Sequence, residues 1–184
     1  IKFNNKFIID SKKASVIALL YPDEDDLIRL VLILRNTYNG VHSNQVGFPG
    51  GKVEVEDITL FDTAIRETFE EIGVKVNRNS LIRELHELYI PPSNFTVYPF
   101  LVFLDQKPSF DKDDKEVNEI ISIELGSLLK CEINQVLISV PDKLNNLFED
   151  EKKLVPSFNL AGYNVWGATA MMLSEIRDLI KNVI

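Results

Sequence analysis

The sequence predicts an α/β or α+β sandwich, in which helices lie on both sides of a mixed β-sheet. Apolar runs rich in β-forming residues recur along the chain between turn residues, and a helical pattern occurs once in the middle and once at the end. That order of elements is typical of a sheet flanked by helices. The length of 184 residues suits a single core, so we expect one domain spanning residues 1–184.

The first half of the chain predicts a hairpin, a loop and a helix. Two β-rich runs, residues 13–22 and 27–35, are separated by the acidic turn DEDD and predict the hairpin. Residues 38–44, YNGVHSN, are expected to form a loop. QVGFPGGKV then leads through a short strand into a glycine turn, and a helix is expected from about residue 60 to residue 72.

The second half predicts further strands and a closing helix. Residues 81–90 and 95–104 indicate two strands joined by the turn PPSN. A charged loop, residues 108–119, runs into the strand IISIEL, and LGSLLK is a short helical turn. Residues 157–166, SFNLAGYNVW, have the composition of one strand. We expect the last helix over residues 168–183.

The ends of the central helix are marked by local signals. Thr59 followed three residues later by Asp62 is a capping-box pattern, and Gly73 is the expected residue just past the C-terminus. Apolar residues at helical spacing predict a buried stripe: Phe61, Ile65, Phe69 and Ile72.

Three glutamates share another face of this helix. With Glu67 as the origin and about 100° per residue, Glu70 lies about 60° to one side and Glu71 about 40° to the other. Arg66 precedes Glu70 by one turn and can pair with it. Like charges at this spacing repel one another, which destabilises the helix. A divalent cation bound between the carboxylates would turn this repulsion into net attraction. Hard oxygen ligands suit Mg²⁺ or Mn²⁺.

A run of acids on a helix is more often a solvated face than a metal site. The surroundings of this run favour the second interpretation. FPGG lies just ahead of it, and a glycine turn exposes main-chain carbonyls and lets the backbone approach a ligand.

The composition of the chain argues against several classes of function. The chain has 28 acidic and 20 basic residues, a net charge of −8, which argues against a general binder of nucleic acid or anionic membranes. No apolar run reaches the roughly 18 to 20 residues that span a bilayer. The single cysteine, Cys131, excludes an internal disulfide and is compatible with a reducing compartment, so we expect a cytoplasmic protein.

At residues 50–74 the sequence resembles the Nudix box, G-x5-E-x7-R-E-U-x-E-E-x-G-U, in which U is aliphatic. The second half matches through Arg66, Glu67, Glu70, Glu71 and Gly73, with Thr68 at the first U position. The first half departs from the pattern, because Asp57 replaces the glutamate and eight residues separate it from Arg66.

That spacing is similar to one branch of the family, the coenzyme A pyrophosphatases. Four further segments resemble the branch in order: LILR with HSNQVGFPGG, PPSNFTVYPF, KEVNEI and NVWGATAMML. Asn44 stands where the branch usually has glycine, and asparagine tolerates positive φ better than most residues. The resemblance implies a Nudix-type α/β/α sandwich and hydrolysis of coenzyme A or a derivative to 3′,5′-ADP and a 4′-phosphopantetheine.

The resemblance also implies the roles of the site residues. Mg²⁺ or Mn²⁺ would be held by Glu67, Glu70, Glu71 and the Gly51 carbonyl. Glu67 would serve as ligand, base or both, with Glu116 or Glu119 as a rival base. Arg66 would orient Glu70, and Asp57 would support the helix or an outer metal-bound water.

Substrate contacts are expected from four residues: Arg35, His42, Phe48 and Phe95. Arg35 ends a strand beside the site and would hold a phosphate, with the 3′-phosphate of coenzyme A as the candidate, or else is a surface charge. His42 would contact phosphate, or is an ordinary loop residue. Phe95 and Tyr98 would stack on adenine, although a strand aromatic is more often part of the core.

Two other classes of function remain open. One is a Nudix hydrolase of an ADP-sugar or a dinucleotide polyphosphate, and the other is a non-catalytic Nudix-like binding module. All three glutamates of the box are present, which argues against the binding module. We expect a monomer or homodimer that acts on a small nucleotide-like molecule.

Overall fold

The computed structural model describes residues 10–36, 45–140 and 151–183. It separates the chain into two compact units, Ile1–Gly126 and Ser127–Ile184, and each is described by itself. The predicted mixed α+β class is confirmed, because the larger sheet contains both parallel and antiparallel pairs. The expectation of one domain stays a prediction.

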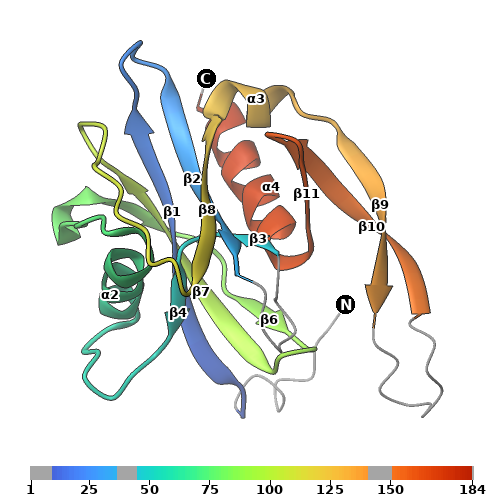
Figure 1. Ribbon diagram of the computed structural model, residues 1–184, viewed down its shortest axis with the longest axis horizontal. Helices are drawn as coiled ribbons and strands as arrows, with labels where there is room; N and C mark the ends of the chain where they lie inside the picture. The colour runs from blue at the N-terminus through green and yellow to red at the C-terminus, as the bar shows by residue number, and fades with distance from the viewer. Residues whose placement is uncertain (1–9, 37–44, 141–150, 184) are drawn as a thin grey trace. The chain divides into compact units, whose positions relative to one another are not determined.

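The first unit is built on an eight-stranded mixed sheet (Figure 1). Its main path runs in the order β3-β2-β1-β7-β5, while β4, β6 and β8 pair with β1, β7 and β2. Only the β1–β7 pair is parallel among the described pairs of this sheet. The strands span Lys12–Pro22 (β1), Ile28–Arg35 (β2), Val46–Gly47 (β3), Gly50–Lys52 (β4), Leu81–Glu84 (β5), Leu88–Ile90 (β6), Phe95–Phe103 (β7) and Val117–Glu124 (β8).

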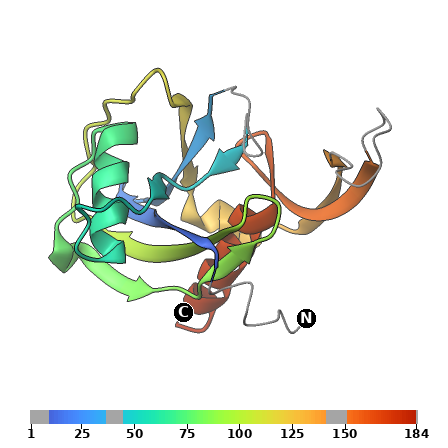
Figure 2. The same ribbon diagram turned by 90° about the horizontal axis from the view of Figure 1, so that it is seen from below.

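The core of this unit lies between the sheet and helix α2, Leu60–Ile72. Ile17 and Leu19 of β1 and Val31 and Ile33 of β2 are fully buried. Burying each such side chain contributes roughly 1.5–3 kcal/mol. Helix α2 lies along β4 and β1 (Figure 1, Figure 2). Packing in this core therefore positions the helix next to the glycine turn.

The predicted ends of α2 are confirmed. The Thr59 hydroxyl accepts a hydrogen bond from the Asp62 amide, and the Asp62 carboxylate accepts one from the Thr59 amide. Gly73 is left-handed, with φ 70°, and its amide donates to the Phe69 carbonyl. Together the two caps satisfy amides and carbonyls that a helix end leaves unpaired.

The predicted buried stripe of α2 is partly wrong. Phe61 and Ile72 are buried, whereas Phe69 is 46% exposed and its ring faces the Lys75 ammonium at 5.8 Å. Three small residues of α2 are fully buried as well: Thr63, Ala64 and Thr68. The buried face of α2 is therefore rotated about the helix axis from the face that apolar spacing predicts.

Two predicted strands are each divided in the structure. Residues 81–90 form β5 and β6 with a break between them. Residues 157–166 form a hairpin instead of one strand, because Ala161 and Gly162 have φ of 50° and 83°. Two successive left-handed residues are the geometry of a tight hairpin turn.

The second unit has a three-stranded antiparallel sheet in the order β11-β10-β9. Its elements are β9 (Ile133–Val140), β10 (Glu151–Leu160), β11 (Tyr163–Trp166) and α4 (Gly167–Lys181), and the short helix α3, Leu125–Lys130, begins just before it. The Arg177 guanidinium of α4 lies 5.0 Å from the centre of the Phe158 ring. In the part of the chain that the structure describes, every helix is too short or too polar to cross a membrane.

Candidate active site

The glycine turn explains why two glycines stand together at the start of β4. Gly50 has φ 141°, and a Cβ there would collide with the backbone of Ser15 and Val16 in β1. A Cβ on Gly51 would collide with the Glu67 carboxylate. The turn therefore lies against β1 on one side and against a charged group of α2 on the other.

The three glutamates expected on one face of α2 differ in exposure. The side chain of Glu70 is 55% exposed, that of Glu67 14% and that of Glu71 1%. Glu71 faces the glycine turn, where its Oε2 accepts a hydrogen bond from the Gly50 amide at 2.7 Å. A buried carboxylate needs such partners, because an unpaired one is very costly to desolvate.

Arg66 holds the other two glutamates. Its Nη1 donates to Glu67 Oε1 at 3.1 Å and to Glu70 Oε2 at 2.9 Å, so the predicted Arg66–Glu70 pair is confirmed. Its Nη2 also donates to the Lys52 carbonyl in β4 at 3.0 Å.

Asp57 holds Arg66 in turn. Its Oδ1 accepts from Arg66 Nε at 3.0 Å, and its Oδ2 accepts from Arg66 Nη2 at 2.9 Å. The same Oδ2 accepts from the Thr63 hydroxyl at 2.9 Å and from the Glu54 amide at 2.8 Å. The residue that departs from the box pattern thus supports the helix through its arginine.

A second arginine lies at the site. Arg35 Nη1 donates to Glu71 Oε1 at 3.0 Å, and Arg35 Nη2 donates to the Gly50 carbonyl at 2.9 Å. Arg35 lies beside the site, as expected from its position at the end of β2, ahead of the segment that leads to the glycine turn. Its carboxylate partner there is Glu71.

The acidic segment before β8 brings a fourth carboxylate. The amides of Asp111 and Asp113 donate to the carbonyls of Ile72 and Glu71, at 2.9 and 3.0 Å. Burial raises the pKa of Glu67 and of Glu71, and the charge of Glu116, which follows in this segment, adds a smaller part of that rise. Glu119, the other rival base, lies on β8 opposite Leu34.

Burial is the largest influence on the pKa values of Glu67 and Glu71. It raises the pKa of Glu71 to about 7, despite the opposing effect of Arg35 and the Gly50 amide. It also raises the pKa of Glu67, against the effect of Arg66. Asp57 shifts the other way, because its hydrogen bonds with Arg66 hold its pKa well below the usual range. A cation near Glu67 and Glu71 would favour their charged forms.

The family model of the NUDIX domain matches residues 11–139. The chain belongs to the Nudix family.

Curated relatives of this Nudix chain include coenzyme A diphosphatases. It is 28% identical over 161 residues to the peroxisomal coenzyme A diphosphatase ndx-8 of Caenorhabditis elegans, covering 86% of this chain and 64% of the relative. It is 33% identical over 154 residues to the mitochondrial coenzyme A diphosphatase NUDT8 of Homo sapiens, covering 82% and 62%. It is 29% identical over 168 residues to Nudix hydrolase 15, mitochondrial, of Arabidopsis thaliana, covering 88% and 56%. The chain thus spans between about half and two thirds of each relative.

Solved structures support the Nudix fold. A MutT/nudix family protein from Enterococcus faecalis superposes with a TM-score of 0.61 at 15% identity, covering 98% of this chain and 64% of that one. The Nudix hydrolase RenU from M. Smegmatis gives 0.59 at 11% identity, covering 95% and 88%. At these identities the likeness concerns the fold alone.

The Nudix box offers carboxylate and carbonyl oxygens, which are the kind of ligand that a hard divalent ion prefers. Glu67 lies where a side chain on Gly51 would be, so a carboxylate and the glycine turn are in close approach. In the described ranges, however, no group of three or more His, Cys, Asp or Glu side chains is arranged to hold a metal. In this arrangement Arg66 engages Glu67 and Glu70, and Arg35 engages Glu71.

The remaining predicted substrate contacts are less accessible or lie elsewhere. Phe48 is 2% exposed, so as placed it offers almost no surface to a substrate. Phe95 is half-buried at the start of β7, and Tyr98 packs against the core, which favours the core interpretation of Tyr98. His42 lies outside the described residues.

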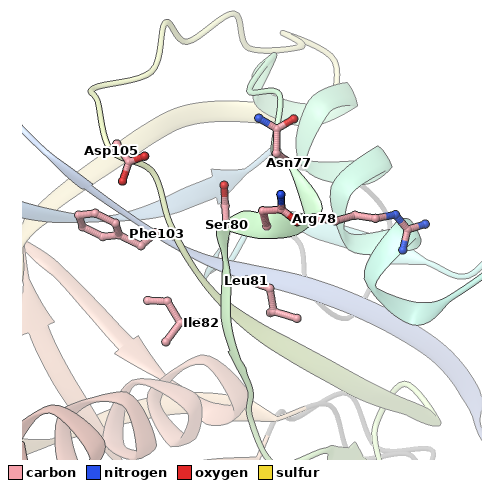
Figure 3. Close-up of a pocket in the computed structure, with 8 residues that line it drawn as sticks. Asn77, Arg78, Ser80, Leu81, Ile82, Phe103 and Asp105 are labelled. Atoms are coloured by element: carbon pink, nitrogen blue, oxygen red, sulfur yellow. The ribbon is translucent and has the colours of Figure 1, made fainter.

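A hollow of about 730 Å³ lies on another part of the first unit (Figure 3). It is lined by the 3₁₀ turn Arg78–Ser80 and its neighbours, with Phe103 and Asp105 from the end of β7 and just beyond. None of the box glutamates lines it. The chemistry of this chain is therefore better sought at the glycine turn than in this hollow.

Proposed function

We propose that this chain hydrolyses the diphosphate bond of coenzyme A or a derivative. Water adds across the P–O–P bond, so that one phosphorus gains the new oxygen and the other phosphate leaves with the bridging oxygen. The products are 3′,5′-ADP and a 4′-phosphopantetheine. The observation that carries the proposal is the approach of the Glu67 carboxylate to Gly51 within a complete set of box glutamates. The two coenzyme A diphosphatases among the relatives support the substrate.

The proposed metal ligands are Glu67, Glu70, Glu71 and the Gly51 carbonyl. Mg²⁺ or Mn²⁺ held there would neutralise the diphosphate and lower the pKa of a bound water. Arg66 orients Glu67 and Glu70, and Asp57 keeps Arg66 in place. Glu67 and Glu116 are the candidates for the group that takes the proton from water.

Long-range attraction does not bring the substrate to the site, because the chain carries a net charge of −8. Binding must then rest on short-range groups and on the metal. The cytoplasmic location and the choice between monomer and homodimer stay predictions. The relatives' names refer to peroxisomes and mitochondria, and those locations belong to the relatives.

The deciding experiment is mass spectrometry of the products formed from coenzyme A with Mg²⁺. Parallel reactions contain 3′-dephospho-coenzyme A, an ADP-sugar and a dinucleotide polyphosphate. We expect 3′,5′-ADP and 4′-phosphopantetheine from coenzyme A, formed faster than products from the others. Faster cleavage of another substrate would assign the chain to a different Nudix hydrolase class. Binding of nucleotide without metal-dependent product would indicate a binding module.

A further inference from the structure

Arg35, Gly50 and Glu71 form a closed ring of three hydrogen bonds. Arg35 Nη1 donates to Glu71 Oε1 at 3.0 Å, the Gly50 amide donates to Glu71 Oε2 at 2.7 Å, and Arg35 Nη2 donates to the Gly50 carbonyl at 2.9 Å. We call these contacts the Arg35 ring. They join the end of β2, the glycine turn and the last turn of α2, which are far apart in the sequence.

The Arg35 ring engages both main-chain polar groups of Gly50. Its amide and its carbonyl each have a charged partner, and Gly50 itself is buried. Hydrogen bonds to charged groups are the stronger kind, and a buried partner left unpaired is costly. Gly51, whose carbonyl is a proposed metal ligand, follows directly. The ring therefore sets the position of the main chain that carries this ligand.

Arg35 is not well disposed to hold a phosphate in this arrangement. Its side chain is 24% exposed, and both Nη atoms already donate to partners within the protein. An arginine carries five N–H donors, so a phosphate would be held either beside these two contacts or by releasing them. Releasing them would leave Glu71, at 1% exposure, without its counter-charge.

We infer that Arg35 is a positioning residue for the glycine turn and Glu71, and that it does not bind the 3′-phosphate of the substrate. The inference rests on the proposed function for its catalytic consequence. Its structural part concerns the protein without metal or substrate.

The first test is hydrogen exchange of the Gly50 amide, followed by NMR on metal-free protein in a chelating buffer. We expect Arg35→Ala to speed this exchange about tenfold or more, since one charged partner of the ring is lost. Arg35→Lys should recover only part of the protection, because an ammonium lacks the planar fork that reaches two acceptors. If Arg35→Ala does not fold, Arg35→Lys carries the test. Unchanged exchange in the variant that folds would overturn the inference.

Arg29→Ala is the matched control. Arg29 lies on the same strand, is similarly exposed, and pairs with Asp23 through its Nε at 2.6 Å. It contacts neither Gly50 nor Glu71 in the described hydrogen bonds. We expect this variant to leave exchange at Gly50 unchanged. Equal acceleration by both variants would indicate a general loosening of β2 and would also overturn the inference.

The second test compares coenzyme A with 3′-dephospho-coenzyme A. A positioning role predicts that Arg35→Ala lowers kcat for both substrates by the same factor and leaves the ratio of their KM values unchanged. A rise in KM for coenzyme A alone, with kcat preserved, would show a phosphate anchor and overturn the inference. If the unaltered protein cleaves neither substrate, the proposed function fails, and the exchange measurement still decides the role of Arg35.

Discussion

The Glu67 carboxylate occupies the space that a side chain on Gly51 would need. The group that limits the side chain at Gly51 is therefore the mobile end of a glutamate. At Gly50 the limiting atoms belong to the backbone of β1, and the φ of 141° is itself unfavourable for other residues. The two adjacent glycines are thus constrained by different groups: Gly51 by the side chain of a proposed metal ligand, and Gly50 by the backbone of β1.

Substituting each glycine separates these reasons. Gly51→Ala should keep most of the stability, because the Glu67 side chain can move, yet lower turnover at least tenfold. Gly50→Ala should lower the free energy of unfolding by roughly 2 kcal/mol or more, because the β1 backbone cannot give way. Urea denaturation and steady-state assays of both variants provide the comparison. Equal stability of the two variants would contradict this account.

Removing charge from the proposed ligands should abolish most activity. Glu67→Gln and Glu71→Gln should each lower turnover about 100-fold or more at saturating Mg²⁺, since electrostatic stabilisation of the transition state is usually the largest contribution. Circular dichroism should show that both variants remain folded. Glu56→Gln, an exposed position between the glycine turn and α2, is the control and should stay active. Activity close to normal in the Glu67 variant would refute the site.

Asp57 should contribute to stability through Arg66. The side chain of Asp57 is 5% exposed and that of Arg66 24%, so Asp57→Asn removes the charge of a largely buried pair. We expect a loss of roughly 2 kcal/mol in the free energy of unfolding, measured in urea at neutral pH. A loss below about 0.5 kcal/mol, the range of ordinary surface changes, would contradict the supporting role.

The same pair predicts a pH dependence. Arg66 holds the pKa of Asp57 in the folded protein below its usual range, while the unfolded chain has the ordinary value of about 3.9. The ionised carboxylate therefore stabilises the fold at pH values above about 4, and this stabilisation is lost as pH falls through the folded pKa. The difference in unfolding free energy between the normal protein and Asp57→Asn should be constant above about pH 5 and shrink below it. A difference that grows in acid would have the wrong sign.

The revised stripe of α2 can be checked with two phenylalanines on the same helix. Phe61 is 8% exposed and its ring lies 5.0 Å from that of Phe100, whereas Phe69 is 46% exposed. Phe61→Ala should lower the free energy of unfolding by about 3 kcal/mol or more. Phe69→Ala should cost less than about 1 kcal/mol, because a surface side chain leaves no cavity. Similar losses of unfolding free energy in the two variants would indicate that Phe69 is buried, as apolar spacing predicts.

Local signals were the reliable part of the sequence analysis. The capping box at Thr59 and the left-handed Gly73 each depend on a few adjacent residues, and both ends of α2 are where these residues predict them. The Arg66–Glu70 pair is also local, one helical turn apart. Such contacts follow from helix geometry and need no knowledge of the sheet.

Contacts between distant segments were less predictable. Arg35 and Glu71 are 36 positions apart, and their pairing depends on how β2, β4 and α2 meet. Whether Phe69 or Thr68 is buried depends on how α2 is rotated about its axis against the sheet, which apolar spacing alone does not determine. Apolar spacing counts Phe69 as core and misses Thr68, which is fully buried.

The segment that carries Glu116 is fastened to α2 through main-chain amides, those of Asp111 and Asp113. An amide donates in the same way whatever side chain its residue carries, with proline the exception. The side chain of Asp111 can therefore change while the path of the segment stays the same, whereas Glu116 is a candidate base. Its length is a different matter, because one residue added between Asp113 and Glu116 would displace Glu116 from the glutamates of α2. Apart from Glu116, this segment should tolerate substitutions better than insertions.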